Sequence, residues 1–225
     1  MVIPARNEAD RIQATVKAAI GLPGVAVVVV VDDGSADETA TAARGAGAVV
    51  TRHARSRGKA AAMETGAEAV RLLDQREHRD QPRHLLFLDA DLAGTAVRAG
   101  PLIDPVLAGA ADMTIAVFGT TVKLGGHGLV VGLSGAGIRR AVGWRPAQPL
   151  NGQRCLTRAA FEAARPLAHG WGAETGLTID LLRQGLRITE VEVDLAHRAT
   201  GSGIRAQLHR AHQLADVARA LATRL

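Results

Sequence analysis

The stretch VAVVVVV (25–31) most constrains the fold, because it holds six valines and one alanine and no polar residue. β-Branched residues favour extended chain, and a strand without polar alternation is typical of a parallel sheet covered on both faces. Parallel neighbours need crossover connections, which are usually helices. The sequence therefore predicts a buried strand in an α/β protein.

Helix and strand patterns alternate around this run. Further strands are expected at 1–6, 48–52 and 84–88, and helices at 8–20, 36–45 and 59–74. This order predicts a doubly wound, mostly parallel sheet with flanking helices and right-handed crossovers. Ligands of such sheets bind beyond the carboxyl ends of the strands, which here are the segments 4–8, 32–35 and 89–91.

The second half of the chain is less regular. A strand is expected at 112–118, a helix at 173–184 and an alternating, half-exposed strand at 186–195. Segment 119–143 carries eight glycines and predicts a mobile loop followed by a weak helix. No linker or internal repeat divides the chain, so one domain is expected.

An amphipathic helix is expected at the end of the chain, from a cap at Ser202 to about residue 223. Its apolar positions are Ile204, Leu208, Leu214, Val217 and Leu221. We expect this helix to pack on the domain. A basic amphipathic contact with a membrane or a partner is the alternative.

Composition excludes several classes of protein. Aromatic residues make up 2% of the chain and tyrosine is absent, which argues against a stacking surface for single-stranded nucleic acid. The single cysteine, Cys155, excludes an internal disulfide and a multi-cysteine metal cluster. No secretory signal is recognisable, and the longest apolar run is too short to span a bilayer. We therefore expect a cytoplasmic protein.

The basic residues are nearly all arginine. Only Lys17, Lys59 and Lys123 are lysines among 27 basic residues, and the net charge is +5. Arginine binds phosphate groups with a planar fork of donors. A phosphate-rich substrate or an acidic surface would explain this excess, and so would a general composition bias.

Two carboxylates follow the expected strand 84–88 in the motif LLFLDADLAG. Asp89 and Asp91 are separated by Ala90, and side chains two residues apart on a strand face the same side. Carboxylate oxygens suit Mg²⁺ or Mn²⁺, and Mg²⁺ is often held by one or two carboxylates plus substrate phosphates. The motif therefore predicts a metal or phosphate site.

The segment VDDGSADET (31–39) also ends a buried strand in carboxylates. A turn and helix cap explains Gly34, Ser35 and Asp37, but it does not explain the adjacent pair Asp32 and Asp33. One of that pair is expected to accept a hydrogen bond from a nucleobase N–H or a ribose hydroxyl.

Polar residues mark two more loops near the start of expected helices. Asn7 and Glu8 follow Pro4, where they would bind a ligand. Alternatively, Asn7 caps the helix and the negative charge of Glu8 interacts favourably with the helix dipole. Gly58 and Lys59 open a helix whose backbone N–H groups favour an anion. The spacings of a P-loop and of a GxGxxG fingerprint are both missing.

Two later motifs carry groups suited to chemistry. HGWGAETG (169–176) places Glu174 at a loop-to-helix entry, and DLAHRATG (194–201) places His197 and Arg198 after a strand. A lone histidine is more often structural than a ligand.

Taken in chain order, these motifs carry a resemblance. VIPARNE, VVDDGSADET, RGKAAAMETG and FLDADL resemble the motifs of family 2-like glycosyltransferases with the GT-A fold, over residues 2–92. PLNGQRCLTRAAFE, GWGAETGL and HRATG are similar to segments of glucosyl-3-phosphoglycerate synthase-type enzymes. The resemblance implies a single Rossmann-like GT-A domain over 1–225, with a nucleotide-binding half (1–92) and an acceptor-binding half (93–225).

The resemblance also assigns roles to individual residues. The nucleotide-sugar would be bound by Pro4, Ala5, Asn7, Glu8, Asp33, Gly58, Lys59, Asp89 and Ala90. The sugar or the acceptor would be held by Gly152, Gln153, Arg154 and Arg198. The catalytic group would comprise Lys59, Asp91 and Glu174, and the metal ligands would be Asp91 and His197.

The leading hypothesis is therefore a glycosyltransferase that uses Mg²⁺ or Mn²⁺. It would move a sugar from a UDP- or GDP-sugar to a small phosphorylated or lipid-phosphate acceptor. Glu174 would be the general base if configuration inverts, and would position sugar or acceptor if it is retained. A nucleotidyltransferase and a non-catalytic nucleotide-sugar-binding protein are the alternatives. Peripheral membrane contact and a homodimer stay open, and no nucleic acid partner is expected.

Overall fold

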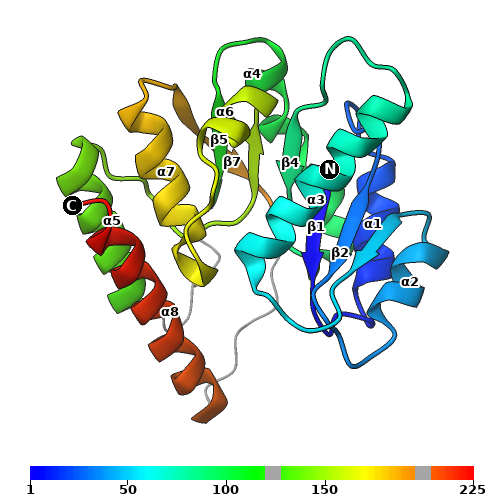
Figure 1. The fold of residues 1–225 in the computed structure, drawn as a ribbon, viewed down its shortest axis with the longest axis horizontal. Coiled ribbons are helices and arrows are strands. Elements are labelled where there is room, and N and C mark those ends of the chain that lie inside the picture. Colours follow the sequence, from blue (N-terminus) through cyan, green and yellow to red (C-terminus); the bar gives the residue numbers. More distant parts are fainter. Residues whose placement is uncertain (120–127, 196–203) are drawn as a thin grey trace.

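A seven-stranded sheet forms the centre of the protein. The computed structural model describes residues 1–119, 128–195 and 204–225, with the backbone alone at 204–210. The strand order is β3-β2-β1-β4-β6-β5-β7 (Figure 1). The strands are β1 (Val2–Ala5), β2 (Val29–Asp32), β3 (Val49–Arg52), β4 (Leu85–Phe87), β5 (Met113–Phe118), β6 (Arg154–Leu156) and β7 (Ile188–Val193).

Helices cover both faces of this sheet. The α-helices are α1 (Ile12–Ile20), α2 (Thr39–Gly45), α3 (Lys59–Arg76), α4 (Asp104–Leu107), α5 (Gly128–Val142), α6 (Arg158–Ala163), α7 (Ala173–Arg183) and α8 (Ile204–Ala222). The 3-10 helices are η1 (Ala93–Leu102) and η2 (Gly170–Gly172). The expected α/β class with a mostly parallel sheet is thus confirmed.

Alternation along the strands divides the core into two layers. Ile3 and Val30 pack with α1, α2 and η1 on one face, whereas Val2 and Val29 pack with α3, α6 and α7 on the other. Successive strand residues point to opposite faces, so the valine run fills both layers at once. This explains why the run carries no polar residue.

The direction of β6 determines where the loops meet. β1, β2, β3 and β4 are parallel, as are β5 and β7, while β6 is antiparallel to both β4 and β5. Six strands therefore end, and β6 begins, at one edge of the sheet, which we call the carboxyl edge. Segments after β1, β2 and β4 lie there together with the segment before β6.

Several expected boundaries were wrong. The strand expected at 25–31 begins only at Val29, because its partner β1 begins at Val2, which pairs with Val29. The helix expected at 8–20 begins at Ile12, since the Glu8 amide donates to Thr39 Oγ1 at 2.9 Å and holds this segment against the next loop.

The expected loop and weak helix at 119–143 is a well-formed helix from Gly128 onward, and residues 120–127 lie outside the described residues. The elements β6, α6, α4 and η1 had not been predicted at all. Three of them have only three to six residues, which is too short for a hydrophobic period.

The last helix packs on the domain, as expected. Val217 and Leu221 of α8 are buried against Ile138 of α5 and Ile179 of α7, and Figure 1 shows α5 and α8 side by side. Leu214 was expected on this buried face, but it is 39% exposed. Ser202 lies outside the described residues. Among the described helices, none combines the length and apolarity needed to cross a bilayer.

Candidate active site

The ammonium group of Lys59 lies between two carboxylates at the carboxyl edge. Its Nζ is 2.9 Å from Asp89 Oδ1 and 3.0 Å from Glu174 Oε1. Lys59 is the first residue of α3, Asp89 follows β4, and Glu174 is in the first turn of α7. Burial alone would lower the pKa of Lys59, but the two carboxylates hold it above its ordinary value. Lys59 is therefore positively charged in the site.

Gln153 fixes the carboxylate of Asp89 through both ends of its amide. Its Oε1 accepts from the Asp89 amide at 2.7 Å, and its Nε2 donates to Asp89 Oδ2 at 2.6 Å. The side chain of Gln153 is buried, and its backbone N–H donates to Asn151 Oδ1 at 2.9 Å. Gln153 was predicted to hold sugar or acceptor, and the contact that the structure shows is with Asp89.

Gly152 lies against the same cluster, and its lack of a side chain leaves room for the Lys59 ammonium. A Cβ at this position would be 2.2 Å from Lys59 Nζ and 3.2 Å from Asp89 Oδ1. Real Cβ atoms essentially never approach another atom so closely, so only glycine allows the ammonium to reach its place. Segment 151–153 therefore shapes the position of Lys59.

Arg154 had been predicted to contact sugar or acceptor, and the structure overturns this. The residue is 0% exposed and lies beneath the site. Its guanidinium donates to the carbonyls of Asn151 at 2.8 Å, Pro149 at 2.9 Å and Glu174 at 3.1 Å. Burial lowers its pKa to about 10. Arg154 thus ties segment 149–151 to the first turn of α7, which carries Glu174.

Replacing Arg154 with methionine is expected to lower the free energy of unfolding by at least about 3 kcal/mol, because three buried carbonyls lose their donor. Arg187→Met is the control, since Arg187 pairs with Asp112 on the surface and its side chain is 58% exposed. That change is expected to cost less than about 1 kcal/mol. Urea unfolding of both variants measures the difference, and equal losses would contradict the supporting role of Arg154.

The carboxylate of Asp33 is occupied by four donors from one loop. Oδ1 accepts from His53 Nδ1 at 2.7 Å and the Arg57 amide at 2.8 Å, and Oδ2 accepts from Ser56 Oγ at 2.6 Å and the Gly58 amide at 2.9 Å. A carboxylate has about four acceptor sites, so the protein fills them all. The expected contact of Asp33 with a base is therefore disfavoured, and Asp33 instead fixes the loop that leads to Lys59.

Asp33→Asn is expected to lower the free energy of unfolding by about 3 kcal/mol at neutral pH, because the amide cannot accept these four hydrogen bonds. Burial alone would raise the pKa of Asp33, but the hydrogen bonds hold it below its ordinary value. The stabilisation is therefore complete above about pH 4 and is lost as the pH falls through the folded-state pKa.

Urea unfolding at several pH values measures this effect. The gap between wild type and Asp33→Asn should narrow in acid, whereas the exposed Asp10→Asn control should stay close to wild type throughout. A gap that does not depend on pH would refute the assignment.

The loops after β1 and β2 are joined directly. Asn7 has a φ of +56°, its amide donates to Ser35 Oγ at 2.9 Å, and its Oδ1 accepts from the Ala36 amide at 2.9 Å. Asn7 therefore does not cap α1, which was one interpretation of the sequence. Ala5 is buried, and Pro4 and Glu8 are partly exposed beside it. These positions border the carboxyl edge, and their contact with a nucleotide stays a prediction.

The aspartate expected to bind metal, Asp91, lies in the turn after β4. Its carbonyl accepts from Arg11 Nη1 at 3.3 Å, and the carbonyl of the buried Ala90 accepts from Thr15 Oγ1 at 2.8 Å. His197 and Arg198 lie outside the described residues. Within residues 1–119, 128–195 and 204–225, no three or more His, Cys, Asp and Glu residues gather in a group that could hold a metal ion.

Three residues that contribute to the site were not predicted from the sequence. The ring of Trp171 lies 6.0 Å from Lys59 Nζ, close enough for a cation–π contact. His53 and Ser56 hold Asp33. Only Ser56, next to the Arg-Gly-Lys segment, had a local signal; the other two are brought in by tertiary packing.

Comparison with known proteins supports the fold and the family. Residues 1–127 match glycosyl transferase family 2. The crystal structure of glucosyl-3-phosphoglycerate synthase from Mycobacterium tuberculosis with Mn²⁺, UDP-glucose and phosphoglyceric acid superposes with a TM-score of 0.74. It is 25% identical, and the match covers 98% of this chain and 78% of that one. The expected GT-A fold is thus confirmed.

Two curated proteins are also similar. Glycosyltransferase AglJ of Haloferax volcanii is 30% identical over 207 residues, 90% of this chain and 64% of AglJ. The uncharacterized protein MJ1222 of Methanocaldococcus jannaschii is 34% identical over 115 residues, 51% of this chain and 44% of MJ1222. This chain therefore spans less than two thirds of either protein. Because the match to the family extends over more than half of the chain, this protein belongs to glycosyl transferase family 2.

Proposed function

We propose that this protein transfers a sugar from a nucleoside-diphosphate sugar to a small phosphorylated acceptor. The observation that carries the proposal is the Lys59 ammonium held between Asp89 and Glu174 at the carboxyl edge. One ammonium against two carboxylates suits a divalent cation that also binds the donor diphosphate, and preorganised charge is usually the largest contribution to catalysis. The synthase with UDP-glucose and phosphoglyceric acid bound supports these substrate classes. A lipid phosphate is the alternative acceptor.

We further propose a division of labour between the halves of the domain. The loops after β1, β3 and β4, with Asn7 and Glu8 on the first, Gly58 on the second and Asp89 on the third, would bind the donor in the half 1–92. Residues 93–225 would then hold the acceptor and the transferred sugar, with Arg198 as one ligand. The direct hydrogen bonds between the loops after β1 and β2 support a single rigid donor site.

Mg²⁺ or Mn²⁺ fits the chemistry of the donor set. Asp91 would hold the ion together with His197, and a carboxylate plus diphosphate oxygens is a common set for such ions. The bound ion would neutralise negative charge on the departing diphosphate. Lys59 would add its charge to the same region, while Gln153 keeps the Asp89 carboxylate in place.

Glu174 is suited to hold a substrate hydroxyl. Its side chain is 2% exposed, and its Oε2 accepts no hydrogen bond from any described residue. An unsatisfied buried acceptor costs about 1–3 kcal/mol, and a hydroxyl of the sugar or the acceptor would remove this cost. Because Lys59 neutralises its charge, we assign Glu174 to positioning in a retaining reaction. Action as a base in an inverting reaction is the alternative.

The product of turnover distinguishes the proposed reaction from its alternative. Purified protein is mixed with a panel of UDP- and GDP-sugars, Mn²⁺ or Mg²⁺, and phosphoglycerate or a polyprenyl phosphate. Release of nucleoside diphosphate supports sugar transfer, whereas release of pyrophosphate would indicate a nucleotidyltransferase. Donor binding without either product would indicate a non-catalytic protein.

Asp91→Asn is expected to abolish the dependence of this turnover on Mn²⁺ and to lower kcat/KM by about 10³-fold. The reason is that the amide removes the charge that would hold the ion. Asp10→Asn, which changes an exposed carboxylate between β1 and α1, is the matched control and should leave the rate unchanged. Normal, metal-dependent turnover by Asp91→Asn would refute the metal assignment.

A further inference from the structure

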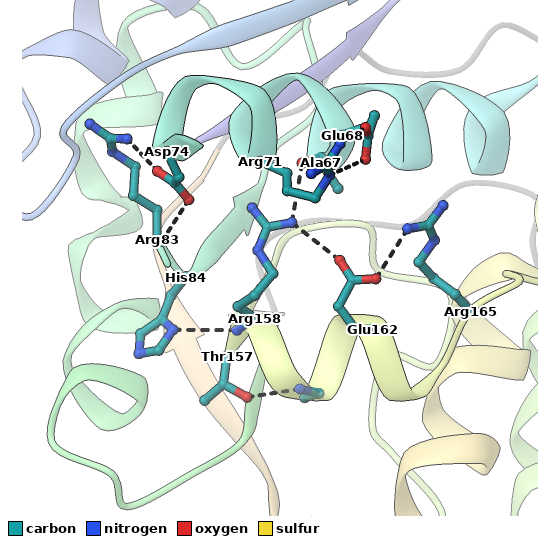
Figure 2. Close-up of polar contacts among 11 residues, drawn as sticks. Ala67, Glu68, Arg71, Asp74, Arg83, His84, Thr157, Arg158, Glu162 and Arg165 are labelled. Atoms are coloured by element: carbon teal, nitrogen blue, oxygen red, sulfur yellow. Dashed lines mark hydrogen bonds and ion pairs between the residues drawn. The ribbon is translucent and has the colours of Figure 1, made fainter. Parts of the chain in front are cut away.

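A cavity lies far from the carboxyl edge, between the end of α3 and the start of α6. Its volume is about 300 Å³, at the lower end of the range for small-molecule sites. Arg71, Asp74 and Gln75 line it from α3, and Arg158 and Glu162 line it from α6. Figure 2 shows four of these side chains, those of Arg71, Asp74, Arg158 and Glu162. Arg71 is 12 residues beyond Lys59, just over three turns or about 18 Å along α3. The cavity is therefore separate from the candidate active site.

Arg158 is the group in this cavity that lacks partners. Its side chain is 8% exposed, and its Nη1 donates to the Ala67 carbonyl at 3.1 Å and contacts Glu162 Oε1 at 3.4 Å. The Nε and Nη2 atoms are buried and have no hydrogen-bond partner among the described residues. Figure 2 shows Nη1 directed at Ala67 and Glu162, and no hydrogen bond is drawn to the Nε–Nη2 edge of the guanidinium.

The carboxylates nearby are already paired with other arginines. Asp74 pairs with Arg83, and Glu162 accepts from Arg165 Nη1 at 3.1 Å. Arg71 pairs with Glu68, three residues earlier on α3. None of these ion pairs reaches Nε or Nη2 of Arg158, so its charge is only partly compensated. Burial lowers the pKa of this guanidinium, which reflects the cost of keeping the charge there.

The free edge has the chemistry of an oxyanion site. Nε–H and Nη2–H lie side by side on the guanidinium plane and match two oxygens of a carboxylate or phosphoryl group. A buried charged donor left unsatisfied costs more than the roughly 1–3 kcal/mol of a neutral one, so a ligand that satisfies it gains correspondingly. Gln75 is exposed and Arg71 half-exposed, so both can move aside to admit a small ligand.

We propose that the cavity between α3 and α6 binds a small oxyanion, a phosphoryl or carboxylate group, through the Nε–Nη2 edge of Arg158. This site is distinct from the donor and acceptor sites. The inference does not depend on the proposed transfer reaction, because it follows from the unsatisfied edge of a buried arginine in a cavity.

The test measures thermal unfolding of the full chain in sodium phosphate, sodium malonate and sodium chloride at matched ionic strength. A ligand at ten times its Kd shifts the folding equilibrium about elevenfold, which raises Tm by about 3–5 °C for a chain of this size. We expect phosphate or malonate, but not chloride, to produce this rise. A response to phosphate alone identifies a phosphoryl ligand, and a response to malonate alone identifies a carboxylate.

Matched variants show whether the rise in Tm comes from binding at Arg158. Arg158→Gln removes the fork and should abolish the rise, whereas Arg76→Gln removes the same charge from an exposed position on α3 and should keep it. Gln75→Trp is designed to fill the cavity while Arg158 is kept. It is the replacement test if Arg158→Gln does not fold, and it should also abolish the rise in Tm. The proposal is overturned if neither anion raises Tm, or if the rise persists in Arg158→Gln or Gln75→Trp.

Discussion

Lys59→Met is expected to lower kcat/KM for sugar transfer by about 10³-fold while leaving the protein folded. Methionine keeps most of the length and apolar volume of lysine but removes the ammonium that lies within 3.0 Å of both Asp89 and Glu174. Without it, the two carboxylates repel each other by about 2–3 kcal/mol at an effective dielectric of ~20. Release of nucleoside diphosphate from the preferred donor measures the loss.

Two further variants show whether the position of the charge matters. Lys17→Ala removes a lysine from an exposed position of α1 and should leave turnover unchanged. Lys59→Arg keeps the charge but adds bulk in a space confined by Gly152, so it should restore little activity. Turnover by Lys59→Met near that of wild type would show that Lys59 has no part in the reaction.

Gly152→Ala is expected to lower kcat by about 10²-fold or more with little loss of stability. The added Cβ would be 2.2 Å from Lys59 Nζ, so the ammonium must leave its place between the carboxylates. A displacement of about 1 Å near a reacting centre can cost this much. Steady-state kinetics measures kcat, and circular dichroism checks the fold.

Gly94→Ala is the matched control, because a Cβ there would meet nothing within 4 Å. It adds the same methyl group to the protein, on η1 instead of segment 151–153. Its kcat should equal that of wild type. Equal kinetics for both variants would mean that the tight packing of Gly152 on Lys59 is not needed for turnover.

The sequence predicted the parts of the site that depend on strand ends. Asp89 and Lys59 were placed at the carboxyl edge because both follow from the alternation of strands and helices. Glu174 was predicted at a helix entry, and the structure brings it to Lys59. These positions depend on local pattern and on the general topology of parallel sheets.

Arg154 and Asp33 were misjudged for a different reason. Both carry charge next to a strand end, and no local pattern around them indicates that their partners come from within the protein. The carbonyl of Glu174 lies 20 residues from Arg154, and His53 lies 20 residues from Asp33. Such partners depend on how distant segments pack, which a single sequence does not encode in any local pattern.

The antiparallel strand β6 makes the two halves of the protein depend on one another. It is the only described strand between β4 and β5, so β3-β2-β1-β4 meets β5-β7 through three residues. Loss of β6 would leave each group of strands its internal hydrogen bonds but separate Asp89 from Gln153. All three residues of β6 are buried between two paired strands, so in hydrogen exchange their amides should open only with global unfolding, and the Asp89–Gln153 contact should be lost together with the fold.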